Sequence, residues 1–241
     1  MTKQEKIDLL KKDVTSDFDL IHLNQERFPV DMGGFATPVI KDVRVNNYLI
    51  KSNDDVSYVY GELFNPEFEA LMSKILESLQ MIDVDVSDRY CFVTYDQRTV
   101  KADTTMRKSG WHIDGLQGDE VPVKRKPDIL FCLSNNNPTV FSSQKMDASS
   151  INLSEYNVFK WIENNINPDH SFQSEEDRLY GFSSYQLHKT APPVNYETYR
   201  IFCRIAFSHV PITSTRTTLN NDIKYNYETH VTSGEIPRHL R

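Results

Sequence analysis

The segment from Tyr199 to Ser208 constrains the fold more than any other part of the chain. Its side chains alternate between two sets: Tyr199, Ile201, Cys203, Ile205 and Phe207, and Arg200, Phe202, Arg204 and Ala206. Since consecutive residues of a strand point to opposite faces of a sheet, this pattern predicts a strand with one face in an apolar core. The face with both arginines fits either an exposed surface or a barrel interior. An interior position requires anionic partners, because unpaired buried charges are strongly unfavourable.

Other short apolar runs, each bounded by turn residues, predict further strands. Three of them cover residues 90–95, 129–133 and 139–141. Between residues 17 and 60 the pattern predicts a series of hairpins, with turns at Gly33-Gly34, Asn46-Asn47 and 53–55. The expected strands of that region are Phe18–Ile21, Val43–Val45, Tyr48–Ile50 and Val56–Tyr60. Together these runs predict a mainly β fold.

Three helices are expected beside the strands. Thr2 and Glu5 form a capping box, which predicts a helix at the start of the chain. Asn65 followed by Pro66 is typical of a second helix start. Apolar side chains then recur three or four positions apart at Phe68, Leu71, Met72, Ile75, Leu76 and Leu79. Such a broad apolar face needs a sheet to cover. A third, shorter helix is expected over 154–164.

Length and charge limit the class of protein. A chain of 241 residues suits one β barrel or sandwich with added helices, so we expect a single domain over 1–241. The 27 basic and 34 acidic residues give a net charge of −7 without a dominant block of like charge. This composition makes nucleic acid an unlikely partner, although a local basic cleft is compatible with it. The basic cluster 124–126 fits a solvated loop or a contact for an anionic substrate.

The cysteines and the N-terminus indicate the compartment. Cys91, Cys132 and Cys203 each lie in an apolar run, and their odd number and spacing argue against a disulfide framework or a zinc knuckle. They are typical of buried thiols in a reducing cell interior. The N-terminus lacks an apolar signal region, and no apolar stretch approaches the roughly 18 residues of a membrane span. We therefore expect a cytoplasmic protein that does not bind membranes.

A candidate metal site precedes the strand with the two arginines. On an extended chain His112 and Asp114, two positions apart, point to the same face and could hold one metal ion. His188 would complete a set of two imidazoles and one carboxylate. This set leaves adjacent coordination positions open and suits a non-haem Fe(II). A His-x-Asp triplet by itself is also common on solvated surfaces, so the later elements are needed to support the interpretation.

Taken in order, His-x-Asp, a distant histidine and then an arginine resemble the Fe(II)/2-oxoglutarate-dependent oxygenases over residues 90–208. In that family an arginine or lysine after the distal histidine binds the far carboxylate of 2-oxoglutarate. Arg200 and Arg204 follow His188 by 200 − 188 = 12 and 204 − 188 = 16 positions. The resemblance favours Arg200 for the C5 carboxylate, because its offset is closer to the usual value. Arg204 would bind the other carboxylate or an anionic group of the substrate.

The resemblance also implies a fold and a reaction. The expected core is a double-stranded β-helix, jelly-roll or cupin-like, over 89–213, with an N-terminal extension and buttressing helix over 1–88 and a tail over 214–241. Fe(II), 2-oxoglutarate and dioxygen would hydroxylate a small polar or anionic metabolite with release of succinate and CO2. Asp114 indicates hydroxylation over halogenation, since halogenating relatives have a small residue in its place.

Two further residues are candidates for the cosubstrate site. Thr139 could hydrogen-bond 2-oxoglutarate, as similar threonines do in parts of the family, and it fits an ordinary strand position equally well. Tyr95 could hydrogen-bond the cosubstrate or line the substrate cavity. Trp111, beside the metal motif, fits the core better than a place near the metal. The cations of 96–108 indicate an anionic substrate or a solvated loop.

Other functions are compatible with the same residues. A cupin-like protein would bind a metal or ligand without turnover, and an oxygenase could instead act on a nucleotide or a nucleic-acid base. A zinc hydrolase has less support, because the sequence has no HExxH helix. Such a hydrolase would need neither oxygen nor 2-oxoglutarate, which separates it from an oxygenase.

Overall fold

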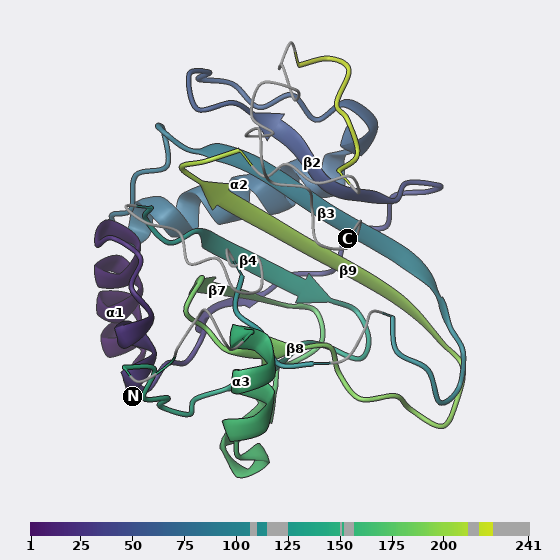
Figure 1. Ribbon diagram of the computed structural model, residues 1–241. Coiled ribbons are helices and arrows are strands. Elements are labelled where there is room, and N and C mark those ends of the chain that lie inside the picture. The colour runs from purple at the N-terminus through teal and green to yellow at the C-terminus, as the bar shows by residue number, and fades with distance from the viewer. Residues whose placement is uncertain (107–109, 115–124, 150, 152–156, 212–216, 224–241) are drawn as a thin grey trace.

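Two antiparallel sheets with flanking helices make up the part of the chain that the computed structural model describes (Figure 1). That part comprises residues 1–106, 110–114, 125–149, 151, 157–211 and 217–223. The elements in chain order are α1 (Lys3–Thr15), η1 (Leu20–Asn24), β1 (Val30–Gly34), β2 (Val45–Lys51), η2 (Gly61–Leu63), α2 (Pro66–Met81), β3 (Tyr90–Val100), β4 (Ile129–Ser134), β5 (Val140–Ser142), α3 (Val158–Asn165), η3 (Pro168–His170), β6 (Ser171–Gln173), β7 (Arg178–Ser183), β8 (His188–Lys189) and β9 (Thr198–Ser208).

The strand order is that of a jelly roll. The large sheet has the order β1-β7-β4-β9-β3-β2 and the small sheet the order β6-β5-β8, to which the segment at His112 adds an isolated bridge with His188. Counted from β3 to β9 and including the His112 segment, the described residues form eight successive β segments. The large sheet takes the first, third, sixth and eighth, and the small sheet takes the others. This arrangement confirms the predicted double-stranded β-helix.

β9 lies in the middle of the large sheet, and its two faces differ as the sequence predicts. It pairs with β3 from Tyr90↔Ser208 to Val100↔Thr198 and with β4 on its other side. Ile201, Cys203, Ile205 and Phe207 belong to the main apolar core. Arg200, Phe202 and Arg204 line a pocket on the opposite face. The arginines therefore lie on the inner face, which was one of the two alternatives.

α2 covers the outer face of the large sheet, behind it in Figure 1. The helix begins at Pro66, and the side chain of Asn65 accepts a hydrogen bond from the backbone N–H of Phe68 at 2.8 Å. Its buried side chains pack in one cluster with residues of β3, β4 and β9. α1 also begins as predicted, with the capping box of Thr2 and Glu5.

Substitution of Asn65 tests how much the N-cap of α2 contributes to the free energy of unfolding. We expect Asn65→Ala to lower the free energy of unfolding by about 1 kcal/mol, because the N–H of Phe68 loses its acceptor. Asn65→Ser, which keeps a side-chain oxygen at the cap, should stay within a few tenths of the wild type. Urea denaturation followed by circular dichroism measures both variants. Equal stability of Asn65→Ala and the wild type would show that the cap contributes nothing.

The predicted hairpins between residues 17 and 60 are mostly wrong. Of the expected strand at 18–21, only residues 20 and 21 belong to an element, the helix η1, and Val56–Tyr60 is not a strand. Asn46-Asn47 does not reverse the chain but lies within the single strand β2, at an irregularity in its pairing with β3. Asn47 has a φ of 48°, a left-handed conformation that asparagine tolerates well. A pair of asparagines can therefore form a bulge as readily as a turn.

The structure tests only part of the predictions about the cysteines, membrane spans and the C-terminal tail. The three cysteines are buried and free, as expected. Among the helices of the described residues, none combines the length and the apolar character that a membrane crossing would need. Of the predicted tail, only residues 217–223 are described, and there the backbone N–H of Thr218 donates to the carbonyl of Asn46 at 2.8 Å.

Candidate metal centre

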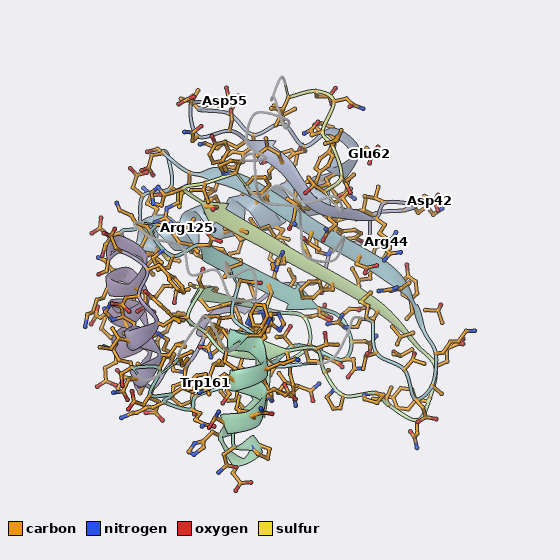
Figure 2. All side chains as sticks on the ribbon, viewed as in Figure 1. Asp42, Arg44, Asp55, Glu62, Arg125 and Trp161 are labelled. Atoms are coloured by element: carbon orange, nitrogen blue, oxygen red, sulfur yellow. The ribbon has the colours of Figure 1, made fainter. Side chains whose placement is uncertain are left out.

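The three predicted metal ligands lie together between the two sheets. His112, Asp114 and His188 each offer one ligand atom, and these atoms lie within 4.8 Å of one another. The alternation along 111–114 explains the arrangement. Trp111 and Ile113 point the other way, into an apolar cluster that includes Val158 and Ile162 of α3 and packs against Trp161, which Figure 2 labels. The prediction that Trp111 belongs to the core is thus confirmed.

Backbone hydrogen bonds hold the two histidines opposite each other. The N–H of His112 donates to the carbonyl of His188 at 3.1 Å, and the N–H of His188 donates to the carbonyl of His112 at 3.0 Å. Residues that exchange both bonds in an antiparallel pair have their side chains on the same face. The imidazole centroids are accordingly 4.3 Å apart. The pairing of these two segments in the small sheet therefore sets the distance between the two imidazoles.

Both imidazoles are oriented to offer Nε2 to a metal. Nδ1 of His112 lies 3.0 Å from the carbonyl of Gly110, and Nδ1 of His188 lies 2.9 Å from the carbonyl of Gln186. A ring that donates from Nδ1 to a carbonyl keeps its Nε2 lone pair as a ligand. Burial lowers the pKa of His188 to about 4, so this ring is neutral at pH 7. Two imidazoles and a carboxylate fit a divalent transition metal.

Asp114 is held by an arginine as well as by its place in the chain. Its Oδ2 lies 3.7 Å from Nε2 of His188, and Nη1 of Arg204 donates to Oδ1 at 3.1 Å and to Oδ2 at 3.0 Å. Nη2 of Arg204 donates to Oδ1 of Asn47 at 3.1 Å and lies 3.4 Å from Oγ1 of Thr94. Sequence reasoning missed Asn47 and Thr94. The signal for Asn47 was an asparagine pair inside a strand-like run.

A pocket opens beside the triad and is rich in cationic groups. Its empty volume is about 470 Å³, including the part open to solvent. The residues that line it are His112, Cys132, Thr139, Phe182, His188, Lys189, Thr190, Arg200, Phe202 and Arg204. Two of these, Arg200 and Arg204, are cations whose side chains lie on the inner face of β9. The positive charge favours anionic molecules in this pocket.

Arg200 is buried and held by main-chain carbonyls. Its side chain belongs to a residue only 4% exposed, and its Nε donates to the carbonyls of Asn136 and Asn137 at 3.1 and 2.9 Å. Nη1 lies 2.7 Å from the sulfur of Met106, and the guanidinium lies 5.1 Å from the ring centroid of Phe202. One edge of the guanidinium is thus fixed, while another faces a thioether, which is a weak acceptor.

Of the two further candidates for the cosubstrate site, Thr139 lines the pocket and Tyr95 does not. Thr139 lines the same pocket as Cys132, whose pKa burial raises to about 12, so that this thiol stays protonated. Tyr95 is fully buried in the core on the outer face of the sheet, where its hydroxyl accepts from the N–H of Ile40 and donates to the carbonyl of Pro38, both at 2.9 Å. The prediction for Tyr95 is therefore corrected, because Tyr95 faces outward from β3.

Arg98 and Arg125, two of the described cations that flank the metal motif, are paired with carboxylates. Arg98 lies 3.0 Å and Arg44, labelled in Figure 2, lies 3.1 Å from the carboxylate of Asp96. Arg125 lies 2.7 Å from Asp128. Residues 107, 108 and 124 lie outside the described residues. Of the predicted anion contacts in 96–108 and 124–126, Arg98 and Arg125 are thus engaged within the protein.

No protein-family model and no curated protein matches the sequence. Among solved structures, that of EvdO2 from Micromonospora carbonacea var. aurantiaca complexed with 2-oxoglutarate aligns over 65% of this chain and 65% of its own, with 9% identity and a TM-score of 0.39. A structure of prolyl 4-hydroxylases from Phytophthora capsici aligns over 62% of this chain and 45% of its own, with 17% identity and a TM-score of 0.33. This chain thus spans less than two thirds of either structure. The function of this chain has to be argued from its own residues.

Proposed function

We propose that this protein is an Fe(II)- and 2-oxoglutarate-dependent oxygenase that hydroxylates a small polar or anionic metabolite, with release of succinate and CO2. The observation that carries the proposal is the combination of two imidazoles and a carboxylate within 4.8 Å of one another, beside a pocket lined by two arginines. Such a ligand set leaves coordination positions for a chelating cosubstrate and for dioxygen. A carboxylate of the cosubstrate is the kind of anion that the buried, inward-facing Arg200 would bind.

Each residue has a distinct part in the proposed reaction. His112, Asp114 and His188 would hold Fe(II), which when bound supplies the activation of dioxygen coupled to oxidation of 2-oxoglutarate. Arg200 would bind the C5 carboxylate, because its fixed guanidinium faces the sulfur of Met106, and a carboxylate is a far stronger acceptor than a thioether. The hydroxyl of Thr139 would add a hydrogen bond to the cosubstrate in the same pocket.

The lining of the pocket supports an anionic or polar substrate of modest size. Lys189 and Thr190 follow the ligand His188 directly and line the pocket. Phe182 and Phe202 contribute apolar walls. A substrate with one anionic group and a short carbon skeleton fits this combination.

The decisive experiment combines binding and turnover. Under anaerobic conditions, protein with Fe(II) and 2-oxoglutarate should give a weak visible metal-to-ligand absorption band. In air, a panel of small carboxylates and phosphates should then reveal one that accelerates succinate formation and gains 16 Da. Binding without succinate for any of these compounds, or for nucleotides and oligonucleotides, would favour a cupin-like binding protein. Turnover without oxygen or 2-oxoglutarate would indicate a hydrolase, and either result overturns the proposal.

Arg200 provides a sharper test of the cosubstrate site. We expect Arg200→Ala to weaken 2-oxoglutarate binding to the metal-loaded protein by at least about 30-fold, because loss of one partner of a buried charge pair costs about 2 kcal/mol or more. The affinity for the metal alone should stay within twofold. Anaerobic titration of the visible band measures the first quantity, and calorimetry measures the second. Unchanged affinity for 2-oxoglutarate would remove Arg200 from the cosubstrate site.

A further inference from the structure

We infer that Arg204, Asn47 and Thr94 form a positioning unit for the carboxylate of Asp114, and that Arg204 is therefore not the receptor for the cosubstrate or the substrate. The inference rests on the metal site of the proposed function, in which Asp114 is a ligand. Arg204 of β9, Asn47 of β2 and Thr94 of β3 would together orient one metal ligand. The contacts of these three side chains with one another support this role.

Arg204 is engaged with Asp114 at one end of its guanidinium. Nη1 donates to both carboxylate oxygens at 3.1 and 3.0 Å, and both side chains are only 16% exposed. A pair shielded to this degree is screened less than a surface ion pair. Oδ2 lies 3.7 Å from Nε2 of His188, so Oδ1 can keep its bond to Arg204 when Oδ2 serves as the metal ligand.

The other end of the guanidinium is fixed by β2 and β3. Nη2 donates to Oδ1 of Asn47 at 3.1 Å and reaches Oγ1 of Thr94 at 3.4 Å. Thr94 is the residue directly opposite Arg204 in the pairing of β3 with β9. The N–H groups of a guanidinium are rigidly related, so fixing Nη2 also fixes the direction in which Nη1 points. Arg204 thus connects the ligand Asp114 to two strands of the large sheet.

The bulge in β2 is what brings Asn47 to this place. Val45 pairs with Tyr95 and Tyr48 pairs with Val93, so Asn46 and Asn47 together oppose the single residue Thr94. A bulge of this kind re-aims a side chain. Asn47 accommodates it with a φ of 48°, and its own N–H donates to Oγ1 of Thr94 at 3.2 Å. The bulge therefore places the amide oxygen of Asn47 within hydrogen-bond distance of Arg204.

The two arginines of β9 are held in different ways, which indicates different tasks. Arg200 is anchored by main-chain carbonyls, and Arg204 by Asp114, Asn47 and Thr94. If Arg204 turned to a cosubstrate carboxylate, Asp114 and Asn47 would each lose a charge-assisted hydrogen bond in a shielded place. The loss of such a partner is costly.

The test is Co(II) binding to the full-length protein in the absence of cosubstrate, measured by titration calorimetry. Variants that keep the local charge are required, because removal of a cation beside the site would by itself favour a divalent ion. Arg204→Lys keeps the charge but cannot reach Asp114, Asn47 and Thr94 together. Asn47→Gly keeps the left-handed backbone and removes the amide. We expect each to weaken Co(II) binding by about 10- to 100-fold, the usual effect of losing a partner that orients a ligand.

Two controls make the result specific. Arg178→Lys changes an arginine of β7 that is paired with Asp31 and Glu175 and not with a ligand residue, so its Co(II) affinity should stay within twofold. Thermal unfolding followed by circular dichroism checks that each variant folds, and Thr94→Val provides a nearly isosteric variant with the same expected direction if Asn47→Gly does not fold. Unchanged Co(II) affinity in Arg204→Lys together with either of the other variants would overturn the inference. So would weaker 2-oxoglutarate binding to Co(II)-saturated Arg204→Lys with unchanged Co(II) affinity.

The same measurements separate this inference from the proposed function. Weaker Co(II) binding in these variants without any oxygen-dependent turnover in the wild type would support the positioning unit and contradict the oxygenase. Oxygen-dependent turnover in the wild type with unchanged Co(II) affinity in the variants would support the oxygenase and contradict the positioning unit.

Discussion

Replacing His188 by alanine is expected to abolish divalent metal binding and, with it, oxygen-dependent succinate formation. His188 is one of three ligand residues, and its imidazole is buried, neutral and oriented by the carbonyl of Gln186. The loss should exceed the roughly 100-fold that follows from removing an outer partner of a ligand. Co(II) calorimetry and the anaerobic band with Fe(II) and 2-oxoglutarate both measure it.

A suitable control for this experiment is His170→Ala. His170 is exposed in η3, and its side chain takes no part in the ligand cluster. We expect metal affinity and succinate formation in this variant to equal those of the wild type. If the His188→Ala protein bound Co(II) as tightly as the His170→Ala protein, the metal centre would have to lie elsewhere.

Removal of Asp13 is expected to destabilise the fold by about 3–5 kcal/mol, because it would leave the charge of Arg27 buried without its partner. Nε and Nη2 of Arg27 donate to the two carboxylate oxygens of Asp13, each at 2.8 Å, and both residues are buried. The carboxylate also accepts a hydrogen bond from the hydroxyl of Ser183 in β7 at 2.7 Å. Asp13 thus connects α1 to the large sheet. Chemical denaturation of Asp13→Ala measures the loss.

The double variant Asp13→Leu/Arg27→Met tests whether the unpaired charge of Arg27 causes this loss of stability. It removes both charges and leaves apolar side chains of similar size, so its stability should lie much closer to that of the wild type than the stability of Asp13→Ala does. A double variant as unstable as Asp13→Ala would show that packing or the bond to Ser183, and not the unpaired charge, sets the effect.

Local periodicity predicted those parts of the fold and of the site that depend on neighbours in the chain. The caps of α1 and α2 are local, and so is the alternation that puts His112 beside Asp114 and Arg200 beside Arg204 on one face. Tyr95 shows the limit of this reasoning. Both faces of its strand are buried from Tyr90 to Asp96, so alternation alone could not decide which face turns toward the pocket.

Features that depend on distant pairing could not be predicted from the sequence. β6 and β8 contain three and two residues, which is too short for a recognisable period. The contacts of Arg204 with Asn47 and Thr94 require the register of three strands, β2, β3 and β9, to be known. The sequence placed the two arginines on one face, but only this register distinguishes the arginine that holds Asp114 from the one that faces Met106.

The mutual backbone hydrogen bonds of His112 and His188 have a consequence for how the chain folds. A slip of one residue between these segments would turn one imidazole to the opposite face, so only the correctly paired chain can bind a divalent ion with both. A ligand that binds the folded state alone stabilises that state in proportion to the logarithm of its concentration over Kd. Cellular Fe(II) would then select the correct pairing of two segments that are far apart in the chain. In refolding experiments, the appearance of Co(II) absorption would mark the moment at which the small sheet closes.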